Sequence, residues 1–184
     1  MQLQLPPRFT GIIQAQFADT SPITTLQDEI IAIHTNHQKL PKLHITLLHQ
    51  SFPKKTVGTN DVRGDKALKK LFKLGTDGVL KAINKVYDPT GKTTYTLPSV
   101  EITGVRLGID MGLGRESTYA IVSNADKLRE FRDLILQAAG IDASTIPYTE
   151  EEAGRIFHVS LTNLTGNGGD SIAYPHSGDQ EVNV

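Results

Sequence analysis

Apolar residues recur every three to four positions in two stretches of the chain, which predicts two helices there. The first stretch follows Ser21-Pro22, a pair typical of a helix N-cap with proline at the first helical position, and should end near His34. The second follows Ser123 or Asn124, either of which can cap it. The stripes comprise Ile23, Leu26, Ile30 and Ile33, and then Leu128, Phe131, Leu134, Ile135 and Ala138.

Alternation of apolar and polar residues predicts strands between these helices. The predicted strands are 9–17, 43–50, 99–109, 118–123 and 155–163, with a hairpin loop at 111–114 and a further, interrupted helical pattern at 67–86. Each half therefore has a similar plan, and interspersed strands and helices favour one α+β domain over residues 1–184. The Gly- and Asn-rich sequence after Thr165 predicts loop, with a flexible C-terminal tail at about 170–184.

The last strand of each half carries the same five-residue pattern. Leu43-His44-Ile45-Thr46-Leu47 and Phe157-His158-Val159-Ser160-Leu161 both read apolar, His, apolar, hydroxyl, apolar. Because side chains alternate along a strand, each motif should bury its apolar face and present its histidine and hydroxyl on the other. Two such strands side by side would offer two imidazoles and two hydroxyls to one cleft, a set that suits a tetrahedral phosphate.

The composition narrows the class of partner. The 19 basic and 20 acidic residues nearly balance, which argues against a long nucleic-acid duplex or an anionic membrane and favours a small charged substrate. The absence of cysteine excludes disulfides, a thiolate nucleophile and a cysteine zinc site. The first residues do not resemble a signal peptide, and no apolar run is long enough to span a membrane. We therefore expect a cytoplasmic protein, in the host cytoplasm if the chain is viral.

With these two motifs the chain resembles the 2H phosphoesterase superfamily, the LigT-like group that includes 2′-5′ RNA ligase-like phosphodiesterases. That superfamily is marked by two His-x-Thr/Ser motifs, each on a central strand. In this chain Ser160 stands where Thr is commoner, and Phe157 stands where proline is frequent. The resemblance implies a bilobal α+β fold, with two antiparallel-rich sheet lobes, outer helices and a central cleft. Members cleave RNA 2′,3′-cyclic phosphates, 2′-5′ linkages or, in phage anti-CBASS enzymes, cyclic oligonucleotide alarm signals.

The predicted catalytic residues are His44 and His158. An unperturbed imidazole titrates near pH 6.5, so one histidine can act as base and the other as acid, although the pattern does not say which. Thr46 and Ser160 would donate hydrogen bonds to phosphate oxygens. The scheme needs no metal or other cofactor. A zinc site on the two histidines is the rival interpretation, but neither motif has an acidic residue two positions away, and no His-Glu-x-x-His occurs.

Three further residues are candidate substrate contacts, namely Arg155, Tyr148 and Tyr174. The loop 165–171 can border the cleft or be a plain connection. The remaining histidines, assigned to surface or core, are His34, His37, His49 and His176. We expect a metal-independent phosphodiesterase acting on a nucleotide or a short or cyclic oligonucleotide, with degradation of antiviral immune signals as one role. An RNA end-processing enzyme and a non-catalytic cyclic-nucleotide-binding module remain the alternatives.

Overall fold

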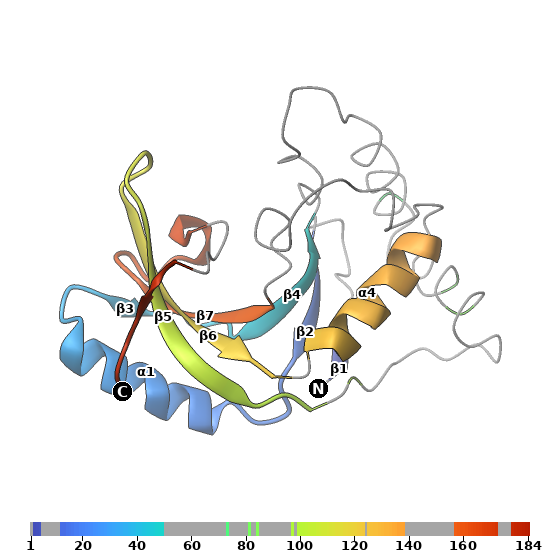
Figure 1. Cartoon of the computed structure of the whole chain (residues 1–184), viewed down its shortest axis with the longest axis horizontal. Helices are drawn as coiled ribbons and strands as arrows, with labels where there is room; N and C mark the ends of the chain where they lie inside the picture. Colours follow the sequence, from blue (N-terminus) through green and yellow to red (C-terminus); the bar gives the residue numbers. More distant parts are fainter. Residues whose placement is uncertain are drawn as a thin grey trace.

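The strands that can be described form one antiparallel sheet, shown in the computed structural model of Figure 1. The structure describes residues 2–4, 12–49, 99–123, 125–138, 157–172 and 178–184, and the single positions 73, 81, 84 and 97. The eight-stranded sheet has the order β1 (Gln2–Gln4), β2 (Ile12–Gln16), β4 (His44–His49), β7 (His158–Asn163), β6 (Arg115–Val122), β5 (Ile102–Asp110) and β8 (Gln180–Glu181), with β3 (Gln38–Lys39) pairing with β7 off this path. The predicted α+β class is confirmed.

Two helices, α1 (Ser21–Ile33) and α4 (Ala125–Ala138), pack against one face of this sheet. In Figure 1 the sheet is strongly curved and α1 runs along its outer side. The apolar stripes predicted from the sequence supply most of the buried side chains of both helices, which join the strands in a single core. Ile33, the last residue of α1, was expected in this core but is 55% exposed, and Leu136 is buried although it lies outside the predicted stripe. The principal members of this core are Ile23, Ile30, Leu128, Phe131 and Ile135 from the helices, and Ala15, Ile45, Leu47, Ala120, Val159 and Leu161 from the strands.

The two halves of the chain follow one plan and meet at the centre of the sheet. The first half contributes β1, β2, α1 and β4, and the second contributes β5, β6, α4 and β7. The strand order is symmetric about the contact between β4 and β7, because each of these is flanked by β2 or β6 and then by β1 or β5. The motif strands are therefore the two innermost strands, and this position lets both contribute to one site.

The hairpin between β5 and β6 matches its prediction. Asp110 pairs with Arg115, and the Asp110 carboxylate accepts hydrogen bonds from the backbone N–H groups of Gly112 and Leu113. Gly114 closes the turn with a φ of 63°, which glycine adopts without the steric cost of a Cβ atom. Because this pairing continues to the turn, β6 begins at Arg115 and not at Thr118 as predicted.

The beginning of α1 differs by one residue from the prediction. Thr20, not Ser21, is the N-cap residue, and its side chain makes no capping hydrogen bond. Asp19 instead accepts a hydrogen bond from the Ser21 N–H at 2.9 Å, and this bond lowers the pKa of the Asp19 carboxyl. At α4, the Ser123 side chain accepts from the Glu101 N–H and so fastens the start of β5 to the end of β6. The helix begins at Ala125, directly after the two residues predicted as alternative caps, of which Asn124 lies outside the described residues.

The C-terminal segment contains more structure than the predicted loop. Gly168–Asp170 form the short 3-10 helix η2, and β8 pairs with the outer edge of β5. The Val182 N–H also donates to the Val105 carbonyl at 2.9 Å. An open strand edge offers backbone groups to any extended segment that reaches it, and local composition does not reveal such a partner. The flexibility proposed for residues 170–184 stays a prediction.

Most of the predicted helix at 67–86 lies outside the described residues, although Lys73, Lys81 and Asn84 are helical. No helix in the described part of the chain combines the length and hydropathy needed to cross a membrane.

Candidate functional site

The two motif strands present the faces that the alternation predicts. Ile45, Leu47, Val159 and Leu161 are at most 2% exposed and lie in the core between sheet and helices. The intervening side chains, His44, Thr46, His158 and Ser160, are partly exposed. They therefore lie on the opposite side of the sheet, which we call the histidine face.

The pairing of β4 with β7 brings the two motifs together. The strands are antiparallel neighbours, and Ile45 is the partner of Val159. Continuing this register by one residue in each direction places His44 opposite Ser160, and Thr46 opposite His158. Directly opposed residues have Cβ atoms about 4.5–5.5 Å apart and project on the same face. In this register, each histidine has the hydroxyl of the other motif as its cross-strand neighbour.

Each motif strand contains one residue that has no partner on its outer neighbouring strand, and this residue stands at the same position of the two motifs. β2 pairs Gln14 with Thr46 and Ile13 with Leu48, so Leu47 has no partner on β2. β6 pairs Tyr119 with Ser160 and Thr118 with Thr162, so Leu161 has no partner on β6. In each case a β-bulge follows the hydroxyl residue directly. Bulges bend a strand and increase its twist, and they are common beside active sites.

The bulge in β7 is stabilised from the helix side of the sheet. The Leu161 carbonyl accepts hydrogen bonds from the Leu40 N–H at 3.0 Å and from the buried Gln27 amide of α1 at 2.7 Å. Beyond the bulge, Thr162 and Asn163 pair with β3 instead of β4. A buried polar group without a partner is costly, so these bonds fix the end of the second motif.

His44 lies in a partly buried position that favours its neutral form. Burial lowers the pKa of its imidazole below the usual 6.5. The hydrogen bond to the Lys42 carbonyl opposes this change, and the positive charge of Lys42 adds to it. Nδ1 lies 3.2 Å from that carbonyl, which can only accept, so Nδ1 carries the proton. In the neutral ring the Nε2 lone pair is then available to take a proton.

His158 is positioned by an aromatic neighbour from β6. Its ring meets the Tyr119 ring edge-on, with 5.5 Å between centroids and an interplanar angle of 72°. Tyr119 is itself buried, and its hydroxyl donates to the Asp179 carboxylate at 2.6 Å. Asp179 belongs to the C-terminal segment just before β8. The second histidine thus depends on a contact between the sheet and the end of the chain.

Further polar residues of the histidine face emerge only from the strand order. Tyr119 lies opposite Ser160 and also opposite Arg106 on β5, while Gln16 lies opposite His44. A polar row therefore crosses β2, β4, β7, β6 and β5. Gln16, Tyr119 and Arg106 were not among the site residues predicted from the sequence. The sequence shows each of them as a polar residue in a predicted strand. Their position beside the motifs depends on pairing between distant segments, which the sequence pattern does not show.

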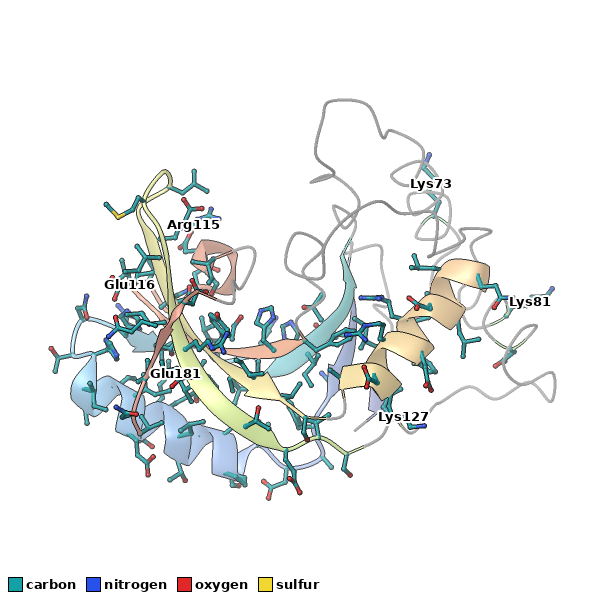
Figure 2. All side chains as sticks on the ribbon, viewed as in Figure 1. Lys73, Lys81, Arg115, Glu116, Lys127 and Glu181 are labelled. Atoms are coloured by element: carbon teal, nitrogen blue, oxygen red, sulfur yellow. The ribbon has the colours of Figure 1, made fainter. Side chains whose placement is uncertain are left out.

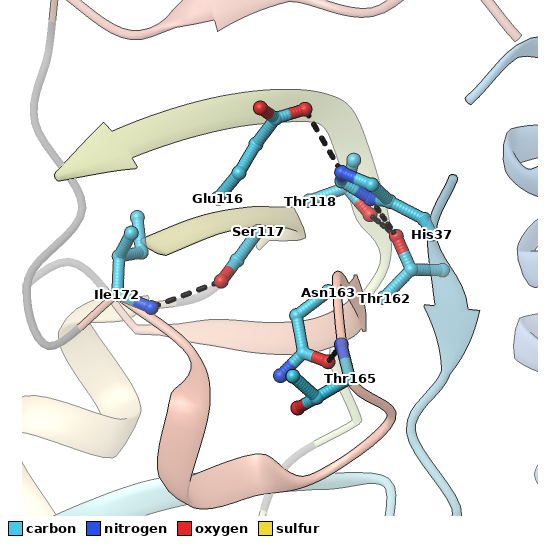
Figure 3. Close-up of polar contacts among 8 residues, drawn as sticks. All are labelled: His37, Glu116, Ser117, Thr118, Thr162, Asn163, Thr165 and Ile172. Atoms are coloured by element: carbon cyan, nitrogen blue, oxygen red, sulfur yellow. Dashed lines mark hydrogen bonds and ion pairs between the residues drawn. The ribbon is translucent and has the colours of Figure 1, made fainter. Parts of the chain in front are cut away.

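The loop after β7 is built around one buried side chain. The Asn163 side-chain oxygen accepts from the Thr165 N–H (Figure 3) and also from the Gly166 N–H. Its side-chain amide donates to Asn167 O and Ser171 Oγ. Asn163 lies opposite Ser117, whose hydroxyl accepts from the Ile172 N–H at 2.9 Å. Since Ser117 shares a face with Tyr119, the loop 165–171 is anchored on the histidine face.

The three candidate substrate contacts, Arg155, Tyr148 and Tyr174, lie outside the described residues. No family model matches the chain, and neither the curated proteins nor the solved structures contain a match.

Proposed function

We propose that the protein is a metal-independent phosphodiesterase of the 2H type, with His44 and His158 as its acid–base pair. The observation that carries this proposal is the register of β4 and β7, which sets the two motifs opposite each other on the two central strands. The symmetric strand order and the two equivalent bulges support the further proposal of a bilobal 2H fold, in which the junction of β4 and β7 is the floor of a central cleft.

His44 is the better candidate for the general base. Its lowered pKa keeps the imidazole neutral at neutral pH, and its Nδ1–H donates to a carbonyl, which leaves Nε2 as the acceptor. In the proposed step, Nε2 takes a proton from water or from a ribose hydroxyl as the oxygen attacks phosphorus. A positioned base whose pKa is near the working pH is effective in such transfers.

His158 completes the step as general acid. As the new P–O bond forms, the bond from phosphorus to the leaving oxygen breaks, and His158 gives that oxygen a proton. Thr46 and Ser160 donate hydrogen bonds to the non-bridging oxygens, where negative charge is concentrated in the transition state. Because each imidazole has the hydroxyl of the other motif as its cross-strand neighbour, a phosphate bound across the two strands would be within reach of all four groups. The reaction requires no cofactor.

We propose a nucleotide, or a short or cyclic oligonucleotide, as the substrate. The near-balance of charge favours a compact phosphodiester over a long polymer. The candidates are cyclic oligonucleotide second messengers, 2′-5′ linkages and 2′,3′-cyclic phosphates. Cleavage of antiviral immune signals in the cytoplasm is the role that the resemblance to phage enzymes suggests.

A chromatographic product assay tests the proposal. The purified protein, with excess chelator, is incubated with 2′,3′-cyclic mononucleotides, 2′-5′ and 3′-5′ dinucleotides, and cyclic di- and trinucleotides. The His44→Ala/His158→Ala double variant is assayed in parallel. His34→Ala is the matched control, because it removes a partly exposed histidine from a different place in the fold.

We expect cleavage of at least one compound by the wild type and by His34→Ala, and none by the double variant. Cleavage by the double variant at the wild-type rate would contradict the assignment of the two histidines. Binding without cleavage by the wild type would favour a binding module, and loss of cleavage with chelator would favour a metal-dependent reaction.

A further inference from the structure

A second group of histidines lies at the end of α1, away from the two motifs. The helix ends at Ile33, and a tight turn follows, in which the His37 N–H donates to the His34 carbonyl at 3.0 Å. This turn brings the two imidazoles together, with 5.3 Å between ring centroids. From the sequence, His34 and His37 were both expected to be surface or core residues. His37 is buried and His34 is partly exposed.

His37 is held by polar contacts at both ring nitrogens (Figure 3). Nδ1 lies 2.8 Å from the Thr162 hydroxyl, which in turn lies 2.6 Å from the Thr118 hydroxyl. Nε2 lies 2.9 Å from a carboxylate oxygen of Glu116 on β6. Glu116 is the second residue of β6, close to the hairpin with β5, and Figure 2 shows it at the left of the view. The buried ring therefore joins the turn after α1 to β6 and β7.

These contacts lie on the face opposite the proposed phosphodiesterase site. Glu116 and Thr118 alternate along β6 with Ser117 and Tyr119, which belong to the histidine face. Thr162 follows the bulge in β7 and pairs with Thr118. A ligand at this position would therefore be separated from the motif histidines by the sheet.

The geometry points to a binding site for a divalent transition-metal ion, best matched by Zn²⁺, with His34, His37 and Glu116 as ligands. One donor atom from each residue lies within 4.8 Å of the others. Tetrahedral ligands about 2.0–2.2 Å from zinc are separated by about 3.4 Å. The pair formed by His37 and Glu116 thus needs to open slightly, and the more exposed His34 ring needs to approach.

The surroundings of His37 suit a metal ligand. If Thr162 accepts a proton from Nδ1 and donates its own to Thr118, the Nε2 lone pair points at the Glu116 carboxylate. At 2.9 Å these two atoms share a proton, and zinc would displace it as the pair opens. A ligating histidine usually has its other nitrogen fixed by an oxygen in this way. Two imidazoles and one carboxylate are ligands that zinc accepts, with water in the fourth position.

The site would stabilise the fold without taking part in phosphodiester cleavage. Zinc would join the turn after α1 to β6. A ligand that binds only the folded state raises the free energy of unfolding by RT ln(1 + [Zn²⁺]/Kd). At a free concentration of about 100 times Kd, we expect the midpoint of thermal unfolding to rise by about 5–10 °C.

The test uses the full-length protein, freed of metal with a chelator and then titrated with ZnCl₂. Calorimetry should give one zinc per chain, and thermal unfolding should show the increase in stability. Both effects should be lost in His34→Ala, which leaves the pair of His37 and Glu116 in place, and in Glu116→Gln. Thr35→Ala, an exposed position between the two histidines, is the matched control and should bind zinc as the wild type does.

A measurement on the wild type avoids any dependence on the folding of variants. Long-range proton–nitrogen NMR spectra should show zinc-induced changes at the His34 and His37 rings. Changes at His44 and His158 instead, an unchanged affinity in His34→Ala, or no binding by the wild type would each overturn the proposal. Chelator should leave phosphodiester cleavage unchanged, so failure of the zinc site and failure of the proposed activity are distinguishable.

Discussion

The two halves of the sheet place their histidines in the same way but hold them differently. In the first half, the His44 ring is fixed by the backbone of its own segment, through the Lys42 carbonyl. In the second, the His158 ring packs on Tyr119, which is fixed by Asp179 near the end of the chain. The similarity lies in the strands and bulges, and the difference lies in the neighbours of each ring.

The different surroundings of the two rings distinguish His44 from His158, which the two sequence motifs do not. The motifs are nearly identical and give no reason for one histidine to be the base. The local carbonyl selects the Nδ1 tautomer of His44, and burial favours its neutral form. In the proposed reaction, the two histidines of this symmetric strand arrangement would therefore have different roles, because proton affinity depends on the immediate surroundings of each ring.

The largest expected effect follows from removing either imidazole. We expect His44→Ala and His158→Ala each to lower kcat by about 10²–10⁴, since general acid–base catalysis typically contributes that much. Steady-state kinetics on the best substrate of the panel would measure it. If either variant kept kcat within about threefold of the wild type, the two halves would not share the reaction.

The equivalence of the bulges can be tested by stability. Leu47 and Leu161 occupy corresponding bulge positions and are at most 2% exposed. Leu47→Ala and Leu161→Ala should each lower the free energy of unfolding by about 2–5 kcal/mol, because each leaves a cavity in the shared core. Urea denaturation measures both. A loss below about 1 kcal/mol in only one would show that the halves are not packed equivalently.

The local sequence pattern was sufficient to predict which face of each motif strand is buried. Alternation alone predicted that Ile45 and Val159 are buried and that the two motif histidines lie on the other face of the sheet. It could do so because the side-chain period of a strand is a local property. The apolar stripes of α1 and α4 were predictable for the same reason. The exact start of α1 was not, since the Asp19 carboxylate meets the Ser21 N–H and displaces the expected cap.

The neighbours of the histidines were beyond such patterns. Neither Leu47 nor Leu161 is accompanied by a glycine or proline that would indicate a bulge. Tyr119 reaches His158 only because β6 pairs with β7, and Asp179 reaches Tyr119 only because β8 pairs with the edge of β5. Register between segments far apart in the chain is decided by the whole core, so no short window contains it.

The hydroxyl groups should contribute less than the imidazoles. A hydrogen bond to a charged group is worth about 1.5–3 kcal/mol, so Thr46→Val and Ser160→Ala should each lower kcat by roughly 10- to 100-fold. Thr46→Ser, which keeps the hydroxyl, is the control and should stay close to the wild type. A loss in Ser160→Ala as large as that in His158→Ala would contradict a role limited to holding phosphate oxygens.

The contact that distinguishes the second half can be weakened without removing the aromatic ring. Tyr119→Phe eliminates the hydrogen bond to Asp179 and keeps the edge-on packing against His158. We expect a loss of about 1 kcal/mol in the free energy of unfolding, since Asp179 is only partly buried and water can replace the phenol. Denaturation with and without Asp179→Asn forms a double-variant cycle, and additive losses would show that the two groups are not coupled.

The smallest effect concerns the pH dependence of stability. The His44 pKa is lowered in the folded protein relative to 6.5, so between these two values the unfolded chain binds more protons than the native one. The free energy of unfolding should therefore rise with pH through this window and fall on acidification. Denaturation midpoints of the wild type and of His44→Asn, measured between about pH 5 and 7, should differ in slope, with the variant flatter. Equal slopes would mean that groups other than His44 cause the pH dependence of stability. In the proposed reaction His44 acts as base only when it is neutral, so the same window should contain the acidic limb of kcat/KM, and this limb should disappear in His44→Asn.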